Sequence, residues 1–162
     1  MKFSKIIVIL ASISLFSVLF SSCSDNGVTT PIDNKSFINF KATGSVIKNF
    51  KSDTFTKNES GRNFTFTGTT SDGKEIIMIQ FVNLPESQVD IDLADLTNPT
   101  HAFITYSIQQ TNGTTESYKL TSGNIHVTAN NKNTIEADFS GMYESGLTTI
   151  GFTEGKLEYY VK

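Results

Sequence analysis

The chain lacks tryptophan and is poor in cysteine, histidine and proline: its 162 residues include no Trp, one Cys, two His and three Pro. A single cysteine excludes a disulfide within the chain and any metal site built from several thiolates. Two histidines restrict the enzyme classes that depend on an imidazole base or metal ligand. The absence of tryptophan removes the largest aromatic ring on which a ligand can stack.

The sequence also lacks the short motifs that mark common reactions. It contains no G-x-S-x-G turn, no P-loop, no G-x-G-x-x-G segment and no H-E-x-x-H pair. Beyond residue 22, 11 basic side chains face 16 acidic ones, and this acidic balance argues against binding to nucleic acid. We therefore expect a protein that is not an enzyme, with no catalytic residue, no cofactor and no bound metal.

The N-terminus has the pattern of an export signal. Lys2 and Lys5 precede an apolar run of 15 residues from Ile6 to Phe20, and two serines and a cysteine follow. A membrane-spanning helix needs about 20 apolar residues. A charged start, a shorter apolar run and small residues before a cleavage site are typical of a secretory signal peptide. Residues 1–22 are therefore predicted to be removed.

The segment LFSSC, Leu19 to Cys23, resembles the lipobox of bacterial lipoproteins. The resemblance implies cleavage before Cys23, acylation of its thiol with long chains such as palmitate, and a membrane as the partner of that lipid. Two or more acyl chains hold a protein stably at a bilayer. Residues 23–36 are polar and include Gly27 and Pro31, so we expect them to form the lipidated cysteine and a flexible tether.

From Phe37 onward, short runs of β-branched and aromatic residues alternate with clusters of Gly, Asn, Asp and Ser. Residues 75–82 are apolar on both faces, which is typical of a central strand covered on each side. We expect one all-β domain over residues 37–162, an antiparallel β-sandwich or a partly closed β-barrel of about ten short strands. The expected strands are 37–42, 45–50, 63–67, 75–82, 102–108, 117–120, 124–128, 134–139, 147–152 and 157–161.

The segment 84–96 fits two different structures. Its Pro-Glu pair suits the first turn of one short helix, whereas Val89, Ile91 and Leu93 alternate as in a strand. Both structures remain open from the sequence.

The same segment holds the densest group of acids, Asp90, Asp92 and Asp95. In a strand, the first two would share the outer face and offer oxygens to calcium. Calcium wants six to eight oxygens, usually from a D-x-D-x-D-G loop, and that loop is absent here. A solvent-facing acidic strand edge is the alternative, and the sequence leaves calcium binding open.

Residues 124–139 predict a hairpin with its turn near residues 129–133. Keeping the apolar residues of both strands on one face restricts the register to steps of two residues. His126 then lies opposite either Glu136 or Asp138. This histidine–carboxylate pair is two thirds of a serine triad, but no serine signature accompanies it, and a polar cross-strand pair on a solvated face is the simpler interpretation.

Tyrosines are the only replacement for tryptophan as a stacking platform. Tyr143, Tyr159 and Tyr160 are the candidates for carbohydrate contact, and one of the adjacent pair must face away from the other. The alternative is that one of the pair packs inward while its neighbour lies on the sheet surface, because single surface aromatics are ordinary.

The C-terminal third carries a recurrent pattern of glycines: Ser122-Gly123, Phe139-Ser140-Gly141 and Thr153-Glu154-Gly155-Lys156-Leu157. These segments resemble the small all-β outer-membrane lipoproteins of unknown function of the Bacteroidota type. The resemblance implies an antiparallel β fold and a place in the outer membrane, facing the cell surface or the periplasm, and it implies no activity. Gly155 is expected to mark a bend, a bulge or a tight turn between Phe152 and Leu157.

These patterns lead to one leading functional hypothesis and two alternatives. The leading hypothesis is a non-catalytic binding, adhesion or envelope-scaffolding module for an unknown protein, glycan or small-molecule ligand. The first alternative is a lipocalin-like carrier with an apolar cavity. The second is an envelope hydrolase that uses His126 and a carboxylate.

Overall fold

The computed structural model describes residues 36–131 and 133–161, and the regular elements among them are all β-strands. Alternating apolar and polar residues form most of these strands, because successive side chains of a strand point to opposite faces. Their bounds are β1 Phe37–Gly44, β2 Lys48–Lys51, β3 Thr54–Ser60, β4 Asn63–Thr69, β5 Glu75–Val82, β6 Val89–Asp92, β7 His101–Gln109, β8 Thr115–Lys119, β9 Ser122–Asn131, β10 Thr134–Ser145 and β11 Thr148–Tyr160.

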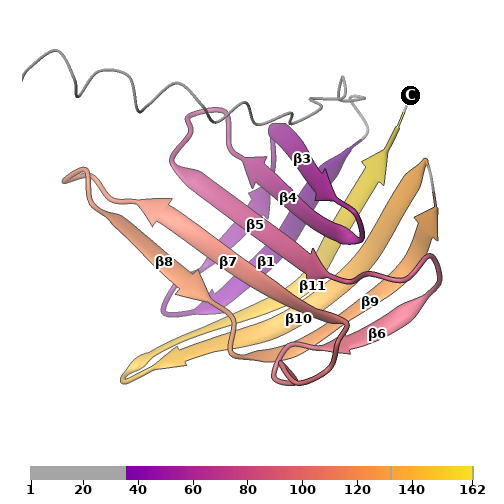
Figure 1. Ribbon diagram of the computed structural model, residues 1–162. Helices are drawn as coiled ribbons and strands as arrows, with labels where there is room; N and C mark the ends of the chain where they lie inside the picture. Colours follow the sequence, from indigo (N-terminus) through magenta and orange to yellow (C-terminus); the bar gives the residue numbers. More distant parts are fainter. Residues whose placement is uncertain (1–35, 132, 162) are drawn as a thin grey trace, which may run out of the picture.

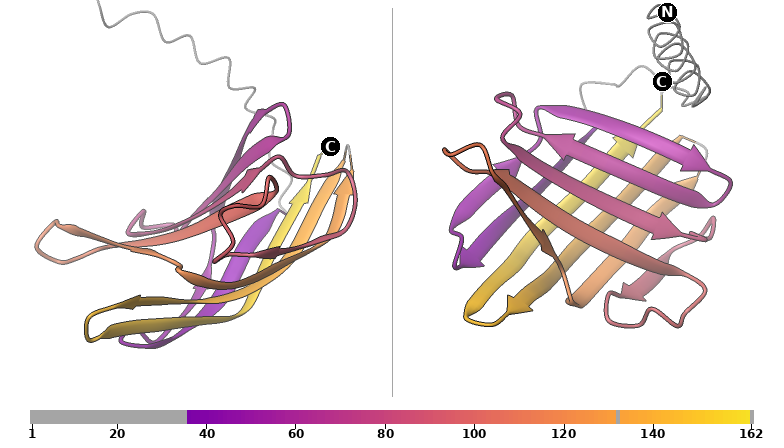
Figure 2. Two further views of the ribbon diagram at one scale, coloured as in Figure 1. Left: turned by 60° about the horizontal axis from the view of Figure 1, so that its bottom comes forward. Right: turned by 60° about the vertical axis from the view of Figure 1, so that its left-hand side comes forward.

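The strands form two antiparallel sheets that pack face to face, which confirms the predicted β-sandwich (Figures 1 and 2). One sheet has six strands in the order β2-β1-β11-β10-β9-β6, and the other has five in the order β3-β4-β5-β7-β8. Their strands run across each other rather than in line (Figure 1). Both sheets keep free edges, so the partly closed barrel is not the observed form.

The chain passes between the sheets four times, and backbone hydrogen bonds mark two of these crossings, from β2 to β3 and from β8 to β9. At the first, Ser52 N donates to Ile38 O of the six-stranded sheet at 2.9 Å, and Asp53 N donates to Thr69 O of the five-stranded sheet at 2.9 Å. At the second, Leu120 N donates to Ile104 O at 2.9 Å before the chain joins β9. These bonds satisfy the backbone where it changes sheet.

The space between the sheets is filled by inward-facing side chains. Phe66, Ile77 and Ile104 are fully buried, and Phe139 is 4% exposed. Rings of both sheets meet there: Phe55 of β3 stacks on Tyr159 of β11 with centroids 5.9 Å apart. A carrier needs an apolar cavity at this place, so the filled core weighs against that alternative.

Several strand predictions need correction. Residues 54–60, which were not predicted as a strand, form β3, and their Thr, Lys, Asn and Glu residues gave little apolar signal. Two predicted strands, 147–152 and 157–161, are one strand, β11. The predicted strand 45–50 is shorter and shifted, as β2.

The structure bears on the prediction for 75–82 and on the two alternatives for 84–96. β5 lies in the centre of its sheet as predicted. Its second face is not covered, because Ile76 is 38% exposed and no layer of the described chain lies over it. In segment 84–96 the strand is correct and the helix is wrong: Val89–Asp92 forms β6 at the edge of the six-stranded sheet.

The predicted leader 1–22, Cys23 and the predicted tether up to residue 35 lie outside the described residues. Ser36, the last tether residue, is buried and its Oγ accepts a hydrogen bond from Tyr160 N at 3.1 Å. Within residues 36–131 and 133–161, no helix is long and apolar enough to span a membrane.

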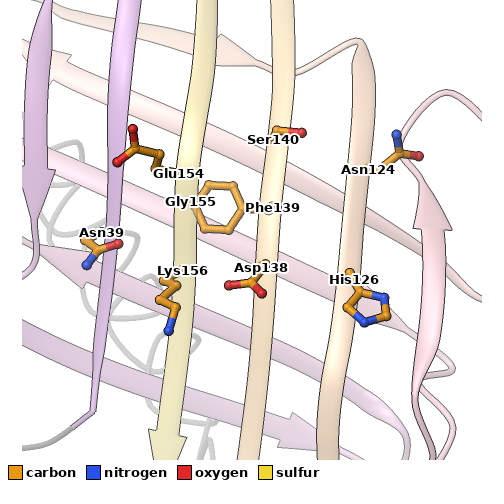
Figure 3. A pocket seen from close by; sticks show the side chains of 9 residues that line it. All are labelled: Asn39, Asn124, His126, Asp138, Phe139, Ser140, Glu154, Gly155 and Lys156. Atoms are coloured by element: carbon orange, nitrogen blue, oxygen red, sulfur yellow. The ribbon is translucent and has the colours of Figure 1, made fainter.

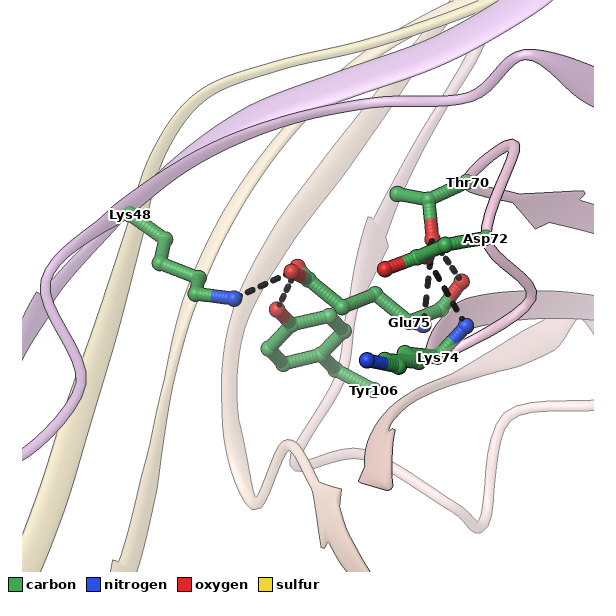
Figure 4. Close-up of polar contacts among 6 residues, drawn as sticks. All are labelled: Lys48, Thr70, Asp72, Lys74, Glu75 and Tyr106. Carbon is green, nitrogen blue, oxygen red and sulfur yellow. Dashed lines mark hydrogen bonds and ion pairs between the residues drawn. The ribbon is translucent and has the colours of Figure 1, made fainter. Parts of the chain in front are cut away.

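A polar contact ties the two sheets together at one end of the sandwich (Figure 4). Glu75 of β5 points inward, and its carboxylate accepts a hydrogen bond from the hydroxyl of Tyr106 at 2.5 Å. The same carboxylate pairs with the ammonium group of Lys48, on β2 of the opposite sheet. Because the ring of Tyr106 is fully buried, this contact satisfies a hydroxyl that would otherwise be desolvated without a partner.

Three tyrosines predict a loss of stability at alkaline pH. Burial, aided by Glu116, raises the pKa of Tyr118 to about 12, and the hydrogen bond to Glu136 raises the pKa of Tyr160 to about 12. Burial also raises the pKa of Tyr106. Since an unfolded tyrosine ionises near pH 10, the folded state holds more protons above that pH, and stability must fall as pH rises from about 10 to about 12.

The measurement is denaturant unfolding at about pH 9 and about pH 11. We expect the free energy of unfolding to be level below pH 10 and lower at pH 11. For Tyr118 alone, the slope reaches at most about 1.4 kcal/mol per pH unit. Tyr118→Phe is the matched variant, and it should flatten the decrease. An unchanged slope in that variant would contradict the argument.

Candidate functional site

A bulge in β11 shapes the outer face of the six-stranded sheet. On one side Asn39 pairs with Lys156 and Lys41 with Thr153, so β11 contains one more residue than β1 between these pairs. The pairing of β11 with β10 shifts at the same place. Glu154 adopts a φ of 52°, a left-handed conformation that is uncommon outside glycine. Such bulges bend a strand and redirect its side chains.

Gly155 follows directly after the bulge and lies under an aromatic ring. It pairs with Phe139 of β10. A Cβ added at Gly155 would lie 2.4 Å from two carbons of that ring and 2.5 Å from the Phe139 carbonyl oxygen. The prediction that Gly155 marks a bend, a bulge or a tight turn is therefore confirmed as a bulge. The residue is glycine because the Phe139 ring leaves no room for a side chain there.

The bent outer face contains a shallow open concavity of about 600 Å³. Its lining residues come from the adjacent strands β1, β11, β10 and β9, and Figure 3 shows how their side chains lie. Phe139 and Gly155 form its floor, since both are buried while the other lining residues are exposed or half-buried. The remaining lining residues are Asn39, Asn124, His126, Asp138, Ser140, Glu154 and Lys156.

One row of polar residues crosses five strands at this concavity. Each member lies opposite the next in the ladder: Asn39 of β1, Lys156 of β11, Asp138 of β10, His126 of β9 and Asp90 of β6. Because directly paired residues have their Cβ atoms about 5 Å apart, the row presents an amide, an ammonium group, a carboxylate, an imidazole and a second carboxylate in order.

Ion pairs surround the concavity. Lys41 Nζ lies 2.6 Å from Glu154 Oε2, which holds the bulge residue against β1. Lys156 Nζ lies 3.4 Å from Glu158 Oε1 on the same strand. Both pairs are solvent-exposed, so they position side chains more than they stabilise the fold.

Four lining side chains have no such partner. They are the amides of Asn39 and Asn124, the carboxylate of Asp138 and the hydroxyl of Ser140. None of these groups makes a hydrogen bond or ion pair with another described residue. An amide and a hydroxyl both donate and accept hydrogen bonds, and a carboxylate accepts them. The concavity therefore offers uncommitted donors and acceptors on a rigid sheet.

The predicted position of His126 is confirmed in one of its two forms: it lies opposite Asp138, not Glu136. The hydrogen bond, however, goes elsewhere. His126 Nδ1 lies 2.5 Å from Asp90 Oδ1 on β6, which the sequence did not bring together with it. In the described part of the chain, no serine hydroxyl hydrogen-bonds to this imidazole, so the geometry of a serine triad is absent there.

The acidic group of segment 84–96 does not converge. Asp90 and Asp92 share the outer face of β6 as predicted. Asp92 instead accepts a hydrogen bond from Ala94 N at 2.8 Å. The carboxylate of Asp95 binds Thr97, and these hydrogen bonds lower the pKa of Asp95. No group of three His, Cys, Asp or Glu side chains among the described residues is arranged to hold a metal.

The three tyrosines do not form a stacking platform at the concavity. Tyr159 is buried in the core, and its neighbour Tyr160 lies on the outer face, which confirms the inward–outward alternative. The hydroxyl of Tyr160 donates to Glu136 at 3.0 Å. Tyr143 packs edge-on against Tyr118 with centroids 5.3 Å apart, near the edge of the core.

Sequence reasoning missed four of the concavity residues, Asn39, Asn124, Ser140 and Lys156. They come from four different strands, and although Ser140 and Lys156 lie in the glycine-containing segments, no pattern marked any of the four as a binding residue. The one available signal was the glycine at 155, which predicted a local irregularity without saying which side chains would surround it.

No protein-family model, curated protein or solved structure matches the chain.

Proposed function

We propose that the protein is a non-catalytic binding module, attached by lipid on Cys23 to the outer membrane, and that the concave face of its six-stranded sheet is the binding surface. The observation that carries the proposal is the set of four polar side chains, Asn39, Asn124, Asp138 and Ser140, that line the concavity without a partner in the described chain. Polar groups that converge on a concave surface are the usual form of a ligand site.

Two further features support this face over the rest of the surface. The concavity is formed at a bulge, and bulges are frequent next to functional sites. Glu154 holds a left-handed backbone conformation at the same point. Such conformations cost free energy, and in proteins they cluster at active sites and ligand-binding sites. The alternatives receive less support: the core is filled where a carrier needs a cavity, and among the described residues no serine hydroxyl hydrogen-bonds to His126.

The test compares three chains in the bacterium that encodes the protein: the wild type, Cys23→Ser, and Cys23→Ser with Asn124→Ala and Asp138→Ala. The wild type should sediment with membranes and need detergent for release, because two or more acyl chains anchor stably. The Cys23→Ser chain should be soluble after its leader is removed. Added to isolated cell envelopes, it should co-sediment with them, and the double face variant should do so at least about fivefold less.

Thr56→Ala with Thr67→Ala, in the Cys23→Ser chain, is the matched control. These two threonines lie opposite each other on the outer face of the five-stranded sheet, so the control removes two polar groups from the other side of the sandwich. It should co-sediment as the parent does. Equal co-sedimentation of the face variant and the control would rule out this face as the binding surface. Identical fractionation of wild type and Cys23→Ser would rule out the anchor.

A further inference from the structure

We infer that the ligand of the concave face is a neutral oligosaccharide, lying across the strands along the row from Asn39 to Asp90. This inference rests on the proposed binding function, and it adds the chemical class of the ligand. Three properties of the face carry it: the balance of its charges, the kind of hydrogen-bonding groups it leaves free, and the spacing of the polar row that crosses its strands.

The charges at the concavity exclude a strongly charged ligand. Two carboxylates, Asp138 and Glu154, line it together with the ammonium group of Lys156 and the imidazole of His126. Three of these four groups have a side-chain partner: Glu154 pairs with Lys41, His126 with Asp90 and Lys156 with Glu158. Asp138 has no ion pair among the described residues and lies opposite Lys156 in the ladder. An anionic ligand would meet the carboxylates and a cationic ligand would meet the lysines. A like charge brought into contact costs free energy, so a neutral ligand fits best.

The free groups match the chemistry of sugar hydroxyls. Each hydroxyl of a sugar both donates and accepts a hydrogen bond. The amides of Asn39 and Asn124 and the hydroxyl of Ser140 can do the same, and the carboxylate of Asp138 accepts from two neighbouring hydroxyls at once. These four side chains have no competing partner among the described residues. Binding would therefore replace water without breaking contacts within the protein.

The spacing of the row matches a chain of sugar rings. Adjacent strands lie about 4.8 Å apart, which is close to the length of one pyranose unit along a chain. An oligosaccharide that crosses the strands thus meets one polar side chain for each sugar, over the five residues of the row. An extended peptide advances only about 3.3 Å per residue, so its side chains would not match the spacing of the row.

Among the residues that line the concavity, the one phenyl or phenol ring is the buried Phe139, and this sets the expected strength. Phe139, the ring in the floor, is 4% exposed and lies over Gly155. Without stacking, a few solvent-exposed hydrogen bonds give a dissociation constant of roughly 0.1–1 mM. Many lipid-anchored copies on one membrane would raise the apparent affinity by avidity.

The test is an NMR titration of the mature Cys23→Ser chain with neutral oligosaccharides of three or more sugars: gluco-, manno- and xylo-oligosaccharides, with oligogalacturonate as the charged comparison. At least one neutral oligosaccharide should shift the amide signals of Asn124, Asp138 and Lys156. Asn124→Ala with Asp138→Ala should weaken that binding at least about tenfold. The control Thr56→Ala with Thr67→Ala should change it less than about twofold.

Binding of oligogalacturonate alone, or shifts confined to the five-stranded sheet, would overturn the oligosaccharide inference. If no oligosaccharide binds but envelope co-sedimentation still depends on the face, the inference fails and the binding function stands. If Asn124→Ala with Asp138→Ala changes neither oligosaccharide binding nor envelope co-sedimentation, the inference and the proposed function fail together.

Discussion

Replacing Phe40 with alanine is expected to destabilise the protein by about 3–5 kcal/mol, the usual cost of removing a buried phenylalanine ring. Phe40 is 2% exposed. Its ring stacks on Phe152 and Phe50 with centroids 4.4 and 5.0 Å away, and meets Tyr106 edge-on at 5.1 Å. Since these rings come from both sheets, the cavity would form where the sheets are held together. A domain of this size has about 5–15 kcal/mol of stability in total.

The measurement is denaturant unfolding of wild type and variant, with the midpoint and the slope compared. Phe37→Ala is the matched control, because Phe37 belongs to the same strand but is only half-buried on the opposite face. We expect it to cost less than about 1.5 kcal/mol. If both variants lose equal stability, the ring cluster around Phe40 is not the main contact between the sheets.

The core was the part of the fold that could be predicted from sequence, because burial follows the alternation of single strands. Ile125, Val127, Ile135 and Ala137 were predicted to share one face, and all four are buried. Such predictions need only local information: a strand whose alternate residues are apolar must turn that face away from water.

The pairing of distant strands could not be predicted in this way. Asp90 and His126 are 36 residues apart, and their contact depends on β6 joining β9 at the sheet edge. The apolar residues of β6 show which of its faces is buried, but they do not specify a partner strand. For the same reason the row from Asn39 to Asp90 was not predicted, although the pairing of His126 with Asp138 was one of the two predicted alternatives.

The strand that was missed shows the limit of the apolar pattern. In β3, Phe55 is the only fully buried residue, and the rest of the strand is polar. An edge strand can be polar because one of its sides has no neighbour to bind, and such composition discourages pairing with other molecules. Its place in the sheet is specified by the β4 ladder, from Thr54 opposite Thr69 to Ser60 opposite Asn63.

The candidate site was predictable only as an irregularity. Gly155, between two predicted strands, indicated a bend, a bulge or a tight turn, and the structure shows a bulge within one strand. Its consequence, a concave outer face, depends on Glu154 being the extra residue relative to both β1 and β10. That relation is a property of three paired strands, and no single one of them encodes it.

Gly155→Ala is the variant that tests whether the bulge supports both the fold and the site. The added methyl group would lie 2.4 Å from the Phe139 ring and 2.5 Å from the Phe139 carbonyl oxygen, so ring and backbone must both move. Overpacking of this kind costs about 1–3 kcal/mol, and we expect the upper end, with Tm lower by about 10 °C. The amide NMR signals of Asp138 and Lys156 should shift, because Asp138 precedes Phe139 and Lys156 follows Gly155, and the two residues are paired.

Gly151→Ala, in the same strand, is the control for this substitution. Its added Cβ would meet only Thr43 Oγ1, at 3.0 Å, and that exposed side chain can rotate away. We expect a change of less than about 1 kcal/mol. Phe139→Leu removes the ring, so combining it with Gly155→Ala should cost less than the sum of the two single changes. Strict additivity would mean that the ring does not account for the glycine, and the floor of the concavity would then need another explanation.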